Sequence, residues 1–508
     1  MDLLATFVLT QIMAASLCFV PAVVVLPDEN TLQTEIGKTV GKAIQELRGK
    51  DAPKVVGRGP IKAAQNAAGR TEQDIQKFSA RLEAYCSASA AWIVKSCELT
   101  DEQQIKLKEI LDDQLVRAAA QFAKSRDPNG QRQKLPRTIP LLFTLPGGQG
   151  TDFTEQFIAT IRKDLLTEEQ TQQLATALGE REVFRSKAYL SYSVAIIDGE
   201  LFLTSSQREA LHSQLTGQWT TMYYPFYAFS PQIDYIPYKS VLTIPLLTEG
   251  KSFLDPSQQK RLQDLSQDGQ LWIIHSATGP DEWARQVMDA GQKKRDAFLR
   301  VAAVQISYYE NELQLSAEQA DHLRIASKGA AVVALADWKE TVDRTKQDLA
   351  QGPRNVLVAV PLNHTNSIDQ NQIWADAVAS VTEGMPRESL NRRKESNRTA
   401  TAQALLAMYD SELWLTPEQR GPLGKLILQT LPSDVNQSVA RSNIRIRDLI
   451  LLTYPLFKTT EQQRVDVISE SQQNVWKQMA SSFHWQQQNN QVDIPLRTGG
   501  SLRYELAE

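Results

Sequence analysis

Cysteine and histidine are scarce in this chain, with 3 and 5 residues respectively, and common catalytic signatures are missing. The sequence has no Gly-x-Ser-x-Gly, no His-Glu-x-x-His and no Cys-x-x-Cys. The histidines lie far apart, at His212, His275, His322, His364 and His484. A metal site usually needs three or more convergent ligands. We therefore expect no catalytic residue, no metal and no cofactor, and a protein that is not an enzyme.

No charge of one sign dominates the chain. Lys plus Arg number 55 and Asp plus Glu number 59, which gives a net charge of -4. This balance argues against nucleic acid as a partner, because nucleic-acid binders usually carry a basic excess. Hydrophobic residues make up 42% and charged residues 22% of the chain, as in ordinary globular proteins. The composition excludes wholesale disorder and a polytopic membrane protein.

Charge is also absent from the first segment, between Asp2 and Asp28. A long apolar run at the N-terminus is typical of a secretory signal or a membrane anchor. We predict that residues 1–27 are a signal peptide or an N-terminal anchor, and that the protein is exported to the periplasm or cell envelope. The membrane is expected as a partner only through this segment, if it is uncleaved. Residues 28–70, interrupted by glycine and proline, are predicted to be a flexible linker.

If Cys18 leaves with a signal peptide, Cys86 and Cys97 remain. Within one helix, eleven residues separate two Cα atoms by about 16 Å. This distance is far beyond the reach of a disulfide. We expect both cysteines to be free and buried.

A short motif recurs four times along the chain. The steps between its copies are 104, 112 and 100 residues (203 − 99, 315 − 203 and 415 − 315). The copies are Leu99-Thr100-Asp101-Glu102-Gln103, Leu203-Thr204-Ser205-Ser206-Gln207, Leu315-Ser316-Ala317-Glu318-Gln319 and Leu415-Thr416-Pro417-Glu418-Gln419. A Pro-Leu dipeptide after an apolar run follows each copy, at Pro140, Pro245, Pro361 and Pro455. A second, weaker copy comes next, at Leu166-Thr167, Leu254-Asp255, Ile368-Asp369 and Thr459. The fixed order predicts four repeats of about 105 residues.

The motif has the pattern of a capping box, in which Thr or Ser begins a helix and the Gln side chain reaches back to its amide. The predicted caps are Thr100 with Gln103, Thr167 with Gln170, Thr204 with Gln207, Ser316 with Gln319, and Thr416 with Gln419. Long helices are expected before the first copies, over residues 72–97, 180–198, 281–312 and 387–412.

The predicted fold is all-α, with four tandem helical repeats. Each repeat is expected to be a helical hairpin plus a second capped helix, and extended Pro-Leu crossings join the parts, since a proline ends each apolar run. The predicted boundaries are 71–178, 179–280, 281–385 and 386–485, with a C-terminal tail over 486–508.

The sequence Leu-Thr-x-x-Gln at the start of an amphipathic helix resembles the LTxxQ motif of the Spy/CpxP family of bacterial periplasmic proteins. The closest copy runs from Glu98 to Lys108. The resemblance covers about ten residues per copy. It implies an exported, helical protein and, by extension, a stress-linked chaperone that holds client proteins. A family member carries two copies in a short chain, whereas this chain has eight in 508 residues.

Aromatic residues concentrate in one segment that prolines keep from forming a regular helix. The segment contains Trp219, Tyr223, Tyr224, Phe226, Tyr227, Phe229, Tyr235 and Tyr238. Tyr and Trp gather at binding sites because they combine a large contact area with a polar tip. The segment is therefore predicted either to bind a partner or to fold back and fill its own repeat.

Three classes of function remain open at this stage. The leading prediction is an exported helical repeat protein that binds protein partners or clients. The alternative is a structural scaffold that spaces other components of the envelope. An enzyme with no recognisable site is the third class, and no residue can be nominated for it.

Overall fold

The structure is a computed structural model. It describes residues 82–124, 153–218, 251–267, 272–274, 280–350, 359–361, 368, 371–431, 455–456, 458–490, 494–495 and 501–502. Within these ranges the protein is all-helical, with 87% of residues in 13 helices. The class predicted from the sequence is therefore confirmed for the described part of the chain.

The helices in chain order begin with one over residues 82–97. Then follow α4 (Asp101–Lys124), α5 (Phe153–Asp164), α6 (Glu168–Leu201), α7 (Ser205–Gln218), α9 (Pro256–Gln267), α10 (Pro280–Glu312), α11 (Ala317–Ala350), α12 (Gln372–Val381), α13 (Arg387–Leu413), α14 (Pro417–Thr430), α17 (Glu461–Val465) and α18 (Glu470–Asn490). Two very short antiparallel ladders accompany them, β1 (Trp272–Ile274) with β2 (Ala359–Pro361) and β3 (Ile494–Pro495) with β4 (Ser501–Leu502). A 3-10 turn, η3 (Lys251–Phe253), precedes α9.

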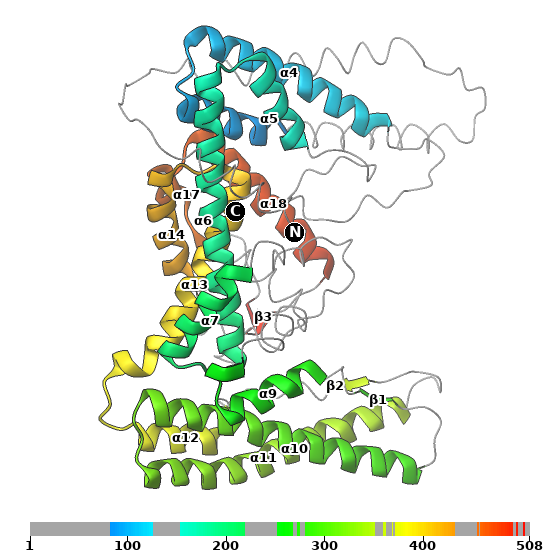
Figure 1. The fold of residues 1–508 in the computed structure, drawn as a ribbon. Helices are drawn as coiled ribbons and strands as arrows, with labels where there is room; N and C mark the ends of the chain where they lie inside the picture. Colours follow the sequence, from blue (N-terminus) through cyan, green and yellow to red (C-terminus); the bar gives the residue numbers. More distant parts are fainter. Residues whose placement is uncertain are drawn as a thin grey trace, which may run out of the picture.

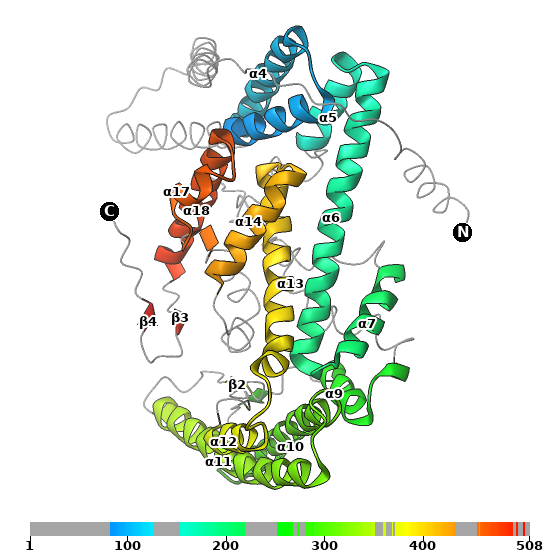
Figure 2. The ribbon, with the colours of Figure 1, turned by 90° about the vertical axis from the view of Figure 1, so that its left-hand side faces the viewer.

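Two long helices, α6 and α13, pack along each other at the centre of the molecule (Figure 1). They are antiparallel, because early α6 meets late α13 through Arg181 and Asp410, and late α6 meets early α13 through Asp198 and Arg393. Figure 2 shows α4 and α5 at one end of this pair and α9 to α12 at the other. At about 1.5 Å per residue, the 34 residues of α6 span about 50 Å.

The core divides into several clusters around this central pair. The largest surrounds α13 and buries Tyr409, Leu413 and Trp476. A second lies between the helix over 82–97, α4 and α5, and it includes Trp414 from the turn after α13. Burying a large apolar side chain contributes roughly 1.5–3 kcal/mol. The two clusters therefore tie chain segments together that are more than two hundred residues apart.

Each first copy of the motif follows a residue in the left-handed backbone region. These four residues are Glu98 (φ 49°), Phe202 (φ 50°), Gln314 (φ 58°) and Trp414 (φ 53°). Helices commonly end with one such residue, and the position usually favours glycine. At Phe202 and Trp414 the aromatic side chain is buried against arginines, which offsets the backbone cost. The same turn thus leads from a long helix into each motif.

Several sequence predictions need correction. The boundary predicted between residues 178 and 179 falls inside α6, because the helix that starts at Glu168 continues to Leu201 without a break. The tail predicted from residue 486 overlaps α18, which reaches Asn490.

Pro361 lies in the short strand β2, as an extended crossing requires. Pro455 and Leu456, in contrast, are helical. Pro140 and Pro245 lie outside the described residues.

The weaker copies in the third and fourth repeats were also placed incorrectly. The cap of α12 is Asn371, not Asp369. In the fourth repeat the cap of α17 is Thr460, with Gln463, rather than Thr459. A further copy, Ser469 with Gln472, was missed.

Cys86 and Cys97 are free and buried, as their spacing predicted. No helix in the described ranges combines the length and apolar character that a membrane span needs.

Candidate functional site

The predicted caps all lie at helix starts, and each glutamine accepts from the amide of its own cap. These Oε1 distances are 3.1 Å for Gln103, 3.1 Å for Gln170, 2.9 Å for Gln207, 2.9 Å for Gln319 and 3.0 Å for Gln419. The hydroxyls of Thr100, Thr167, Thr204 and Ser316 accept from the glutamine amides at 3.2–3.3 Å. At Thr416 the Gln419 amide donates to the backbone carbonyl oxygen at 3.1 Å.

The glutamines have a second role that a capping box does not require. They bond to one another in pairs, each side-chain nitrogen donating to the partner's side-chain oxygen. The pairs are Gln103 with Gln170 (2.7 and 2.9 Å), Gln207 with Gln258 (2.8 and 3.0 Å), and Gln419 with Gln472 (2.8 and 3.0 Å). Each pair couples a first copy of the motif to a second copy more than fifty residues later.

The second glutamine of each pair also binds the end of the preceding long helix. Gln170 donates to the carbonyl oxygen of Cys97 (3.2 Å). Gln258 donates to Leu201 (3.1 Å) and Gln472 to Leu413 (2.9 Å) in the same way. The last carbonyls of a helix have no partner within the helix, so these bonds satisfy groups that would otherwise be buried and unpaired. A glutamine amide can do this because it both donates and accepts.

The third repeat departs from this pattern. Gln319 donates to the carbonyl oxygen of Val381 (3.0 Å), which resembles the bond from Gln103 to Leu165 (3.2 Å). The following helix, α13, has Pro386 at its cap, and no side chain makes a cap bond there. The reciprocal glutamine pair is therefore replaced at this position by a bond to the backbone alone.

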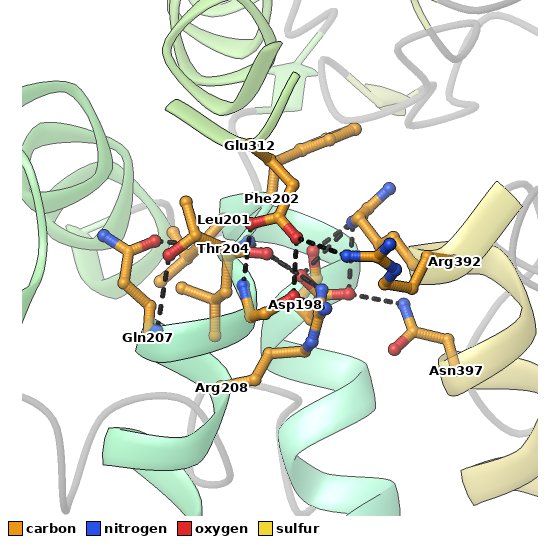
Figure 3. Close-up of polar contacts among 12 residues, drawn as sticks. Asp198, Leu201, Phe202, Thr204, Gln207, Arg208, Glu312, Arg392 and Asn397 are labelled. Carbon is orange, nitrogen blue, oxygen red and sulfur yellow. Dashed lines mark hydrogen bonds and ion pairs between the residues drawn. The ribbon is translucent and has the colours of Figure 1, made fainter. Parts of the chain in front are cut away.

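A buried carboxylate, Asp198, joins α6, α7 and α13 at one end of the central pair (Figure 3). It accepts from Arg393 Nε (3.2 Å), from Asn397 Nδ2 (2.6 Å) and from the Leu203 amide (2.7 Å). Arg208 lies 3.9 Å away as a further ion-pair partner. All these donors satisfy a carboxylate that is 0% exposed, a group that would be costly to bury alone.

A second buried carboxylate, Asp410, joins α6, α13 and α14 at the other end of the central pair. It accepts from Arg181 Nε (2.8 Å) and from Arg420 Nε (3.4 Å), and it is also 0% exposed. Arg181 bonds the Asp410 carbonyl oxygen as well, and its guanidinium lies 3.9 Å from the ring centre of Trp414. Burial lowers the pKa of Arg181, while the charge of Asp410 opposes that effect.

We call the contacts around Asp198 and those around Asp410 the two junctions. They contain corresponding residues at one constant spacing in the sequence. Arg181 corresponds to Arg393, Asp198 to Asp410, Phe202 to Trp414 and Arg208 to Arg420, each 212 residues apart (410 − 198). Arg181 of α6 binds Asp410 of α13, and Arg393 of α13 binds Asp198 of α6. The aromatic contacts match too: Arg393 lies 3.8 Å from the Phe202 ring centre and 5.9 Å from that of Tyr308, and Arg181 lies 3.9 Å from Trp414 and 5.9 Å from Trp92.

Glu312, at the end of α10, binds the start of α7 next to the Asp198 junction. It accepts from the Ser205 amide (3.0 Å) and hydroxyl (2.5 Å), and Arg392 lies 3.8 Å from it. Burial raises the pKa of Glu312, but the bonds from Ser205 and the nearby charges of Arg208 and Arg392 outweigh that effect and leave the pKa lowered. At the other end, Lys95 binds Glu418 at the start of α14 (3.1 Å).

Sequence reasoning missed the arginines and aspartates of the two junctions. A signal was present: residues 198–204 read Asp-Gly-Glu-Leu-Phe-Leu-Thr and residues 410–416 read Asp-Ser-Glu-Leu-Trp-Leu-Thr, with five of seven positions identical. The aromatic residues from Trp219 to Tyr238 lie outside the described residues. The described ranges contain no group of three or more potential metal ligands.

The junctions and glutamine pairs hold helix ends in place. Their polar groups bond to one another and to backbone atoms, so these residues position the helix ends relative to one another. No family model, curated protein or solved structure matches this chain.

Proposed function

We propose that this is an exported helical repeat protein that binds protein partners or clients in the cell envelope. The observation that carries the proposal is the reciprocal glutamine pair, which couples two copies of the LTxxQ-like motif in one framework. The motif resembles that of the Spy/CpxP family, whose members hold clients. A framework that satisfies its own polar groups internally leaves the outer faces of its helices for partners.

We also propose that the chain consists of four repeats arranged as two halves. The 212-residue spacing of the two junctions relates the second repeat to the fourth. Contacts from the first repeat to the start of α14, and from the third to the start of α7, support the same relationship. In this arrangement each half completes the junction of the other.

Export rests on the uncharged apolar run before Asp28 and on the resemblance. N-terminal sequencing of the mature protein tests it. We expect the sequence to begin near residue 22 in an envelope fraction, or to retain Met1 in a membrane fraction if the segment is an anchor. An intact Met1 in the cytosolic fraction would refute export.

A structural scaffold is the second candidate. The observation in its favour is the central pair of α6 and α13, about 50 Å long, which separates two end groups of helices. A scaffold would hold folded components of the envelope at that separation, whereas a chaperone would hold unfolded chains.

Light scattering distinguishes these two functions. The mature chain is added at equal molar amount to a chemically unfolded protein that aggregates on dilution. A chaperone should suppress the scattering of several unrelated clients. A scaffold should suppress none, but it should retain a small, constant set of folded proteins from envelope extract. A chain that does neither would contradict both proposals.

The aromatic segment provides a matched variant for the same assays. Replacing Tyr224, Phe226 and Tyr227 with Ser should abolish capture and leave the melting temperature unchanged if the segment binds a partner. If the segment fills its own repeat, the same change should lower the melting temperature and leave capture by the folded fraction intact, because each buried aromatic lost costs roughly 3 kcal/mol.

A further inference from the structure

The two junctions join opposite halves of the chain. We call residues 71–280 the first half and residues 281–485 the second half, following the two-half arrangement proposed above. Asp198 of the first half accepts from Arg393 and Asn397 of the second half. Asp410 of the second half accepts from Arg181 of the first half. Each half therefore buries a carboxylate for which the other half supplies an arginine.

The ion pairs between the halves have an internal two-fold symmetry. Arg181 and Asp198 lie 17 residues apart on α6 (198 − 181), and Arg393 and Asp410 lie 17 residues apart on α13 (410 − 393). Two antiparallel helices with this spacing form an ion pair at both ends at once. A two-fold contact uses the same patch on both partners, so the ion pairs alone would also allow a half to pair with a second copy of itself. The choice of partner must come from other contacts.

One such contact differs between the junctions. Glu312 of the second half lies beside the Asp198 junction (Figure 3) and accepts from the amide (3.0 Å) and the hydroxyl (2.5 Å) of Ser205 in the first half. The equivalent of Ser205 in the second half is Pro417 (417 − 205 = 212). Proline has no amide hydrogen to donate and no hydroxyl. If two second halves paired, Glu312 would lose both donors, and its side chain is only 13% exposed.

A second contact acts in the same direction at the other junction. Lys95 of the first half binds Glu418 of the second half at 3.1 Å. The equivalent of Glu418 in the first half is Ser206 (418 − 206 = 212), so two first halves would leave Lys95 without this carboxylate. Both side chains are exposed, and the contact adds little affinity. A protein selects one partner through contacts that the wrong partner cannot make, and both contacts favour the unlike half.

We propose that the surface joining the halves is selective: each half binds the unlike half as a separate subunit would, and rejects a second copy of its own kind. The surface consists of α6 and the start of α7 in the first half, and of α13 and the start of α14 in the second. The inference rests on the two halves of the proposed function. Its test involves no client, so its failure would not change the outcome of the light-scattering assay.

Cutting the connection between the halves tests the proposal on the full chain. A recognition sequence for a site-specific protease is inserted between residues 277 and 278, and the folded protein is cut. We expect the two halves to stay together as one particle in size-exclusion chromatography. The cut protein is then dissociated in urea, diluted and analysed by native mass spectrometry. Unlike pairs should dominate. Without selectivity, like and unlike pairs would form in equal amounts. Halves that fail to reassociate, or that form like pairs as often as unlike ones, overturn the proposal.

Ser205→Pro tests the contact that selects the partner. It gives α7 the same first residue as α14, and proline is tolerated at the first position of a helix. Since both donors to Glu312 are removed, the dissociation constant of the cut halves should rise at least about tenfold, and the share of like pairs should increase. Ala317→Pro is the matched control, because Ala317 is the exposed first residue of α11.

Circular dichroism melts of the uncut chains check that both variants fold. An unchanged dissociation constant for Ser205→Pro overturns the proposal, and so does an equal rise for Ala317→Pro.

Discussion

Arg181 donates from Nε to Asp410 Oδ2 at 2.8 Å, although 229 residues separate the two in the chain. The bond joins the first half of α6 to the last turns of α13, and both side chains are almost completely buried. Its counterpart, Arg393 with Asp198, joins the other ends of the same two helices. The central pair is thus held by one ion pair at each end.

Breaking one ion pair should destabilise the protein strongly, because removing one partner leaves a buried charge without compensation. We expect Arg181→Met or Asp410→Asn each to cost about 3–5 kcal/mol. The double variant should cost much less than the sum. Urea denaturation of the four proteins of the cycle measures this coupling. Arg181→Met with Asp198→Asn is the control and should be nearly additive, because these residues belong to different junctions.

The paired glutamines predict a difference between two conservative substitutions. Glutamate serves as well as glutamine in a plain capping box. Gln258→Glu, however, removes the donors to Leu201, Phe202 and Gln207, and it should cost about 2–4 kcal/mol, since buried acceptors are left unpaired. Gln463→Glu should be almost neutral, because within the described part of the chain Gln463 bonds only to its own cap, Thr460. Equal losses of melting temperature would contradict the second role of the paired glutamines.

The cap of α6 can be tested within a single helix. Thr167→Ala should cost about 1 kcal/mol, because the Thr167 hydroxyl accepts from the Gln170 amide (3.2 Å). Thr176→Ala, inside the same helix, should cost little, since alanine is the better helix former. The midpoints of urea denaturation give both values. A larger loss at Thr176 would argue against capping as the role of the motif.

Glu312 predicts a dependence of stability on pH. Its pKa in the folded protein is lowered from the usual 4.5, so its contribution is fully present above 4.5 and is lost as the pH falls through the folded value. Glu312→Gln cannot titrate. The difference in stability between the wild type and this variant should therefore be largest at neutral pH and shrink in acid. A difference that does not change with pH would exclude the carboxylate as its source.

Cys86 and Cys97 should be inert in the folded protein. Burial raises the pKa of Cys86, and burial raises that of Cys97 to about 12 although Arg162 opposes it. Alkylation requires the thiolate. Iodoacetamide at mildly alkaline pH should modify neither residue until denaturant is added, and peptide mapping by mass spectrometry reads out each site. Rapid modification of Cys97 in the native protein would show that its helix opens locally.

The elements that the sequence predicted best are those set by local chemistry. A Thr, two acidic residues and a Gln specify a helix start within five residues, so the caps at Thr100 and Thr167 lie where the motif put them. The repeat boundary predicted between residues 178 and 179 falls inside α6, because Gly179 and Glu180 do not interrupt the helix backbone. An exposed glycine lowers helix stability by only about 1 kcal/mol, less than the packing of α6 against α13 supplies.

The glutamine pairs and the arginine–aspartate junctions could not be placed in the same way. Gln103 and Gln170 are 67 residues apart, and nothing in a five-residue motif indicates which copy will meet which. The seven-residue match between Asp198–Thr204 and Asp410–Thr416 could have suggested equivalent roles. It could not have shown that each aspartate receives the arginine of the opposite helix.

The antiparallel contact between α6 and α13 admits a single register. Sliding one helix along the other by one turn, about 5.4 Å, would pull Arg181 from Asp410 and Arg393 from Asp198 together, and no neighbouring carboxylate stands one turn away on α13 to replace Asp410. The two ion pairs consequently fix the distance between the two end groups of helices, so the central pair is a spacer of constant length.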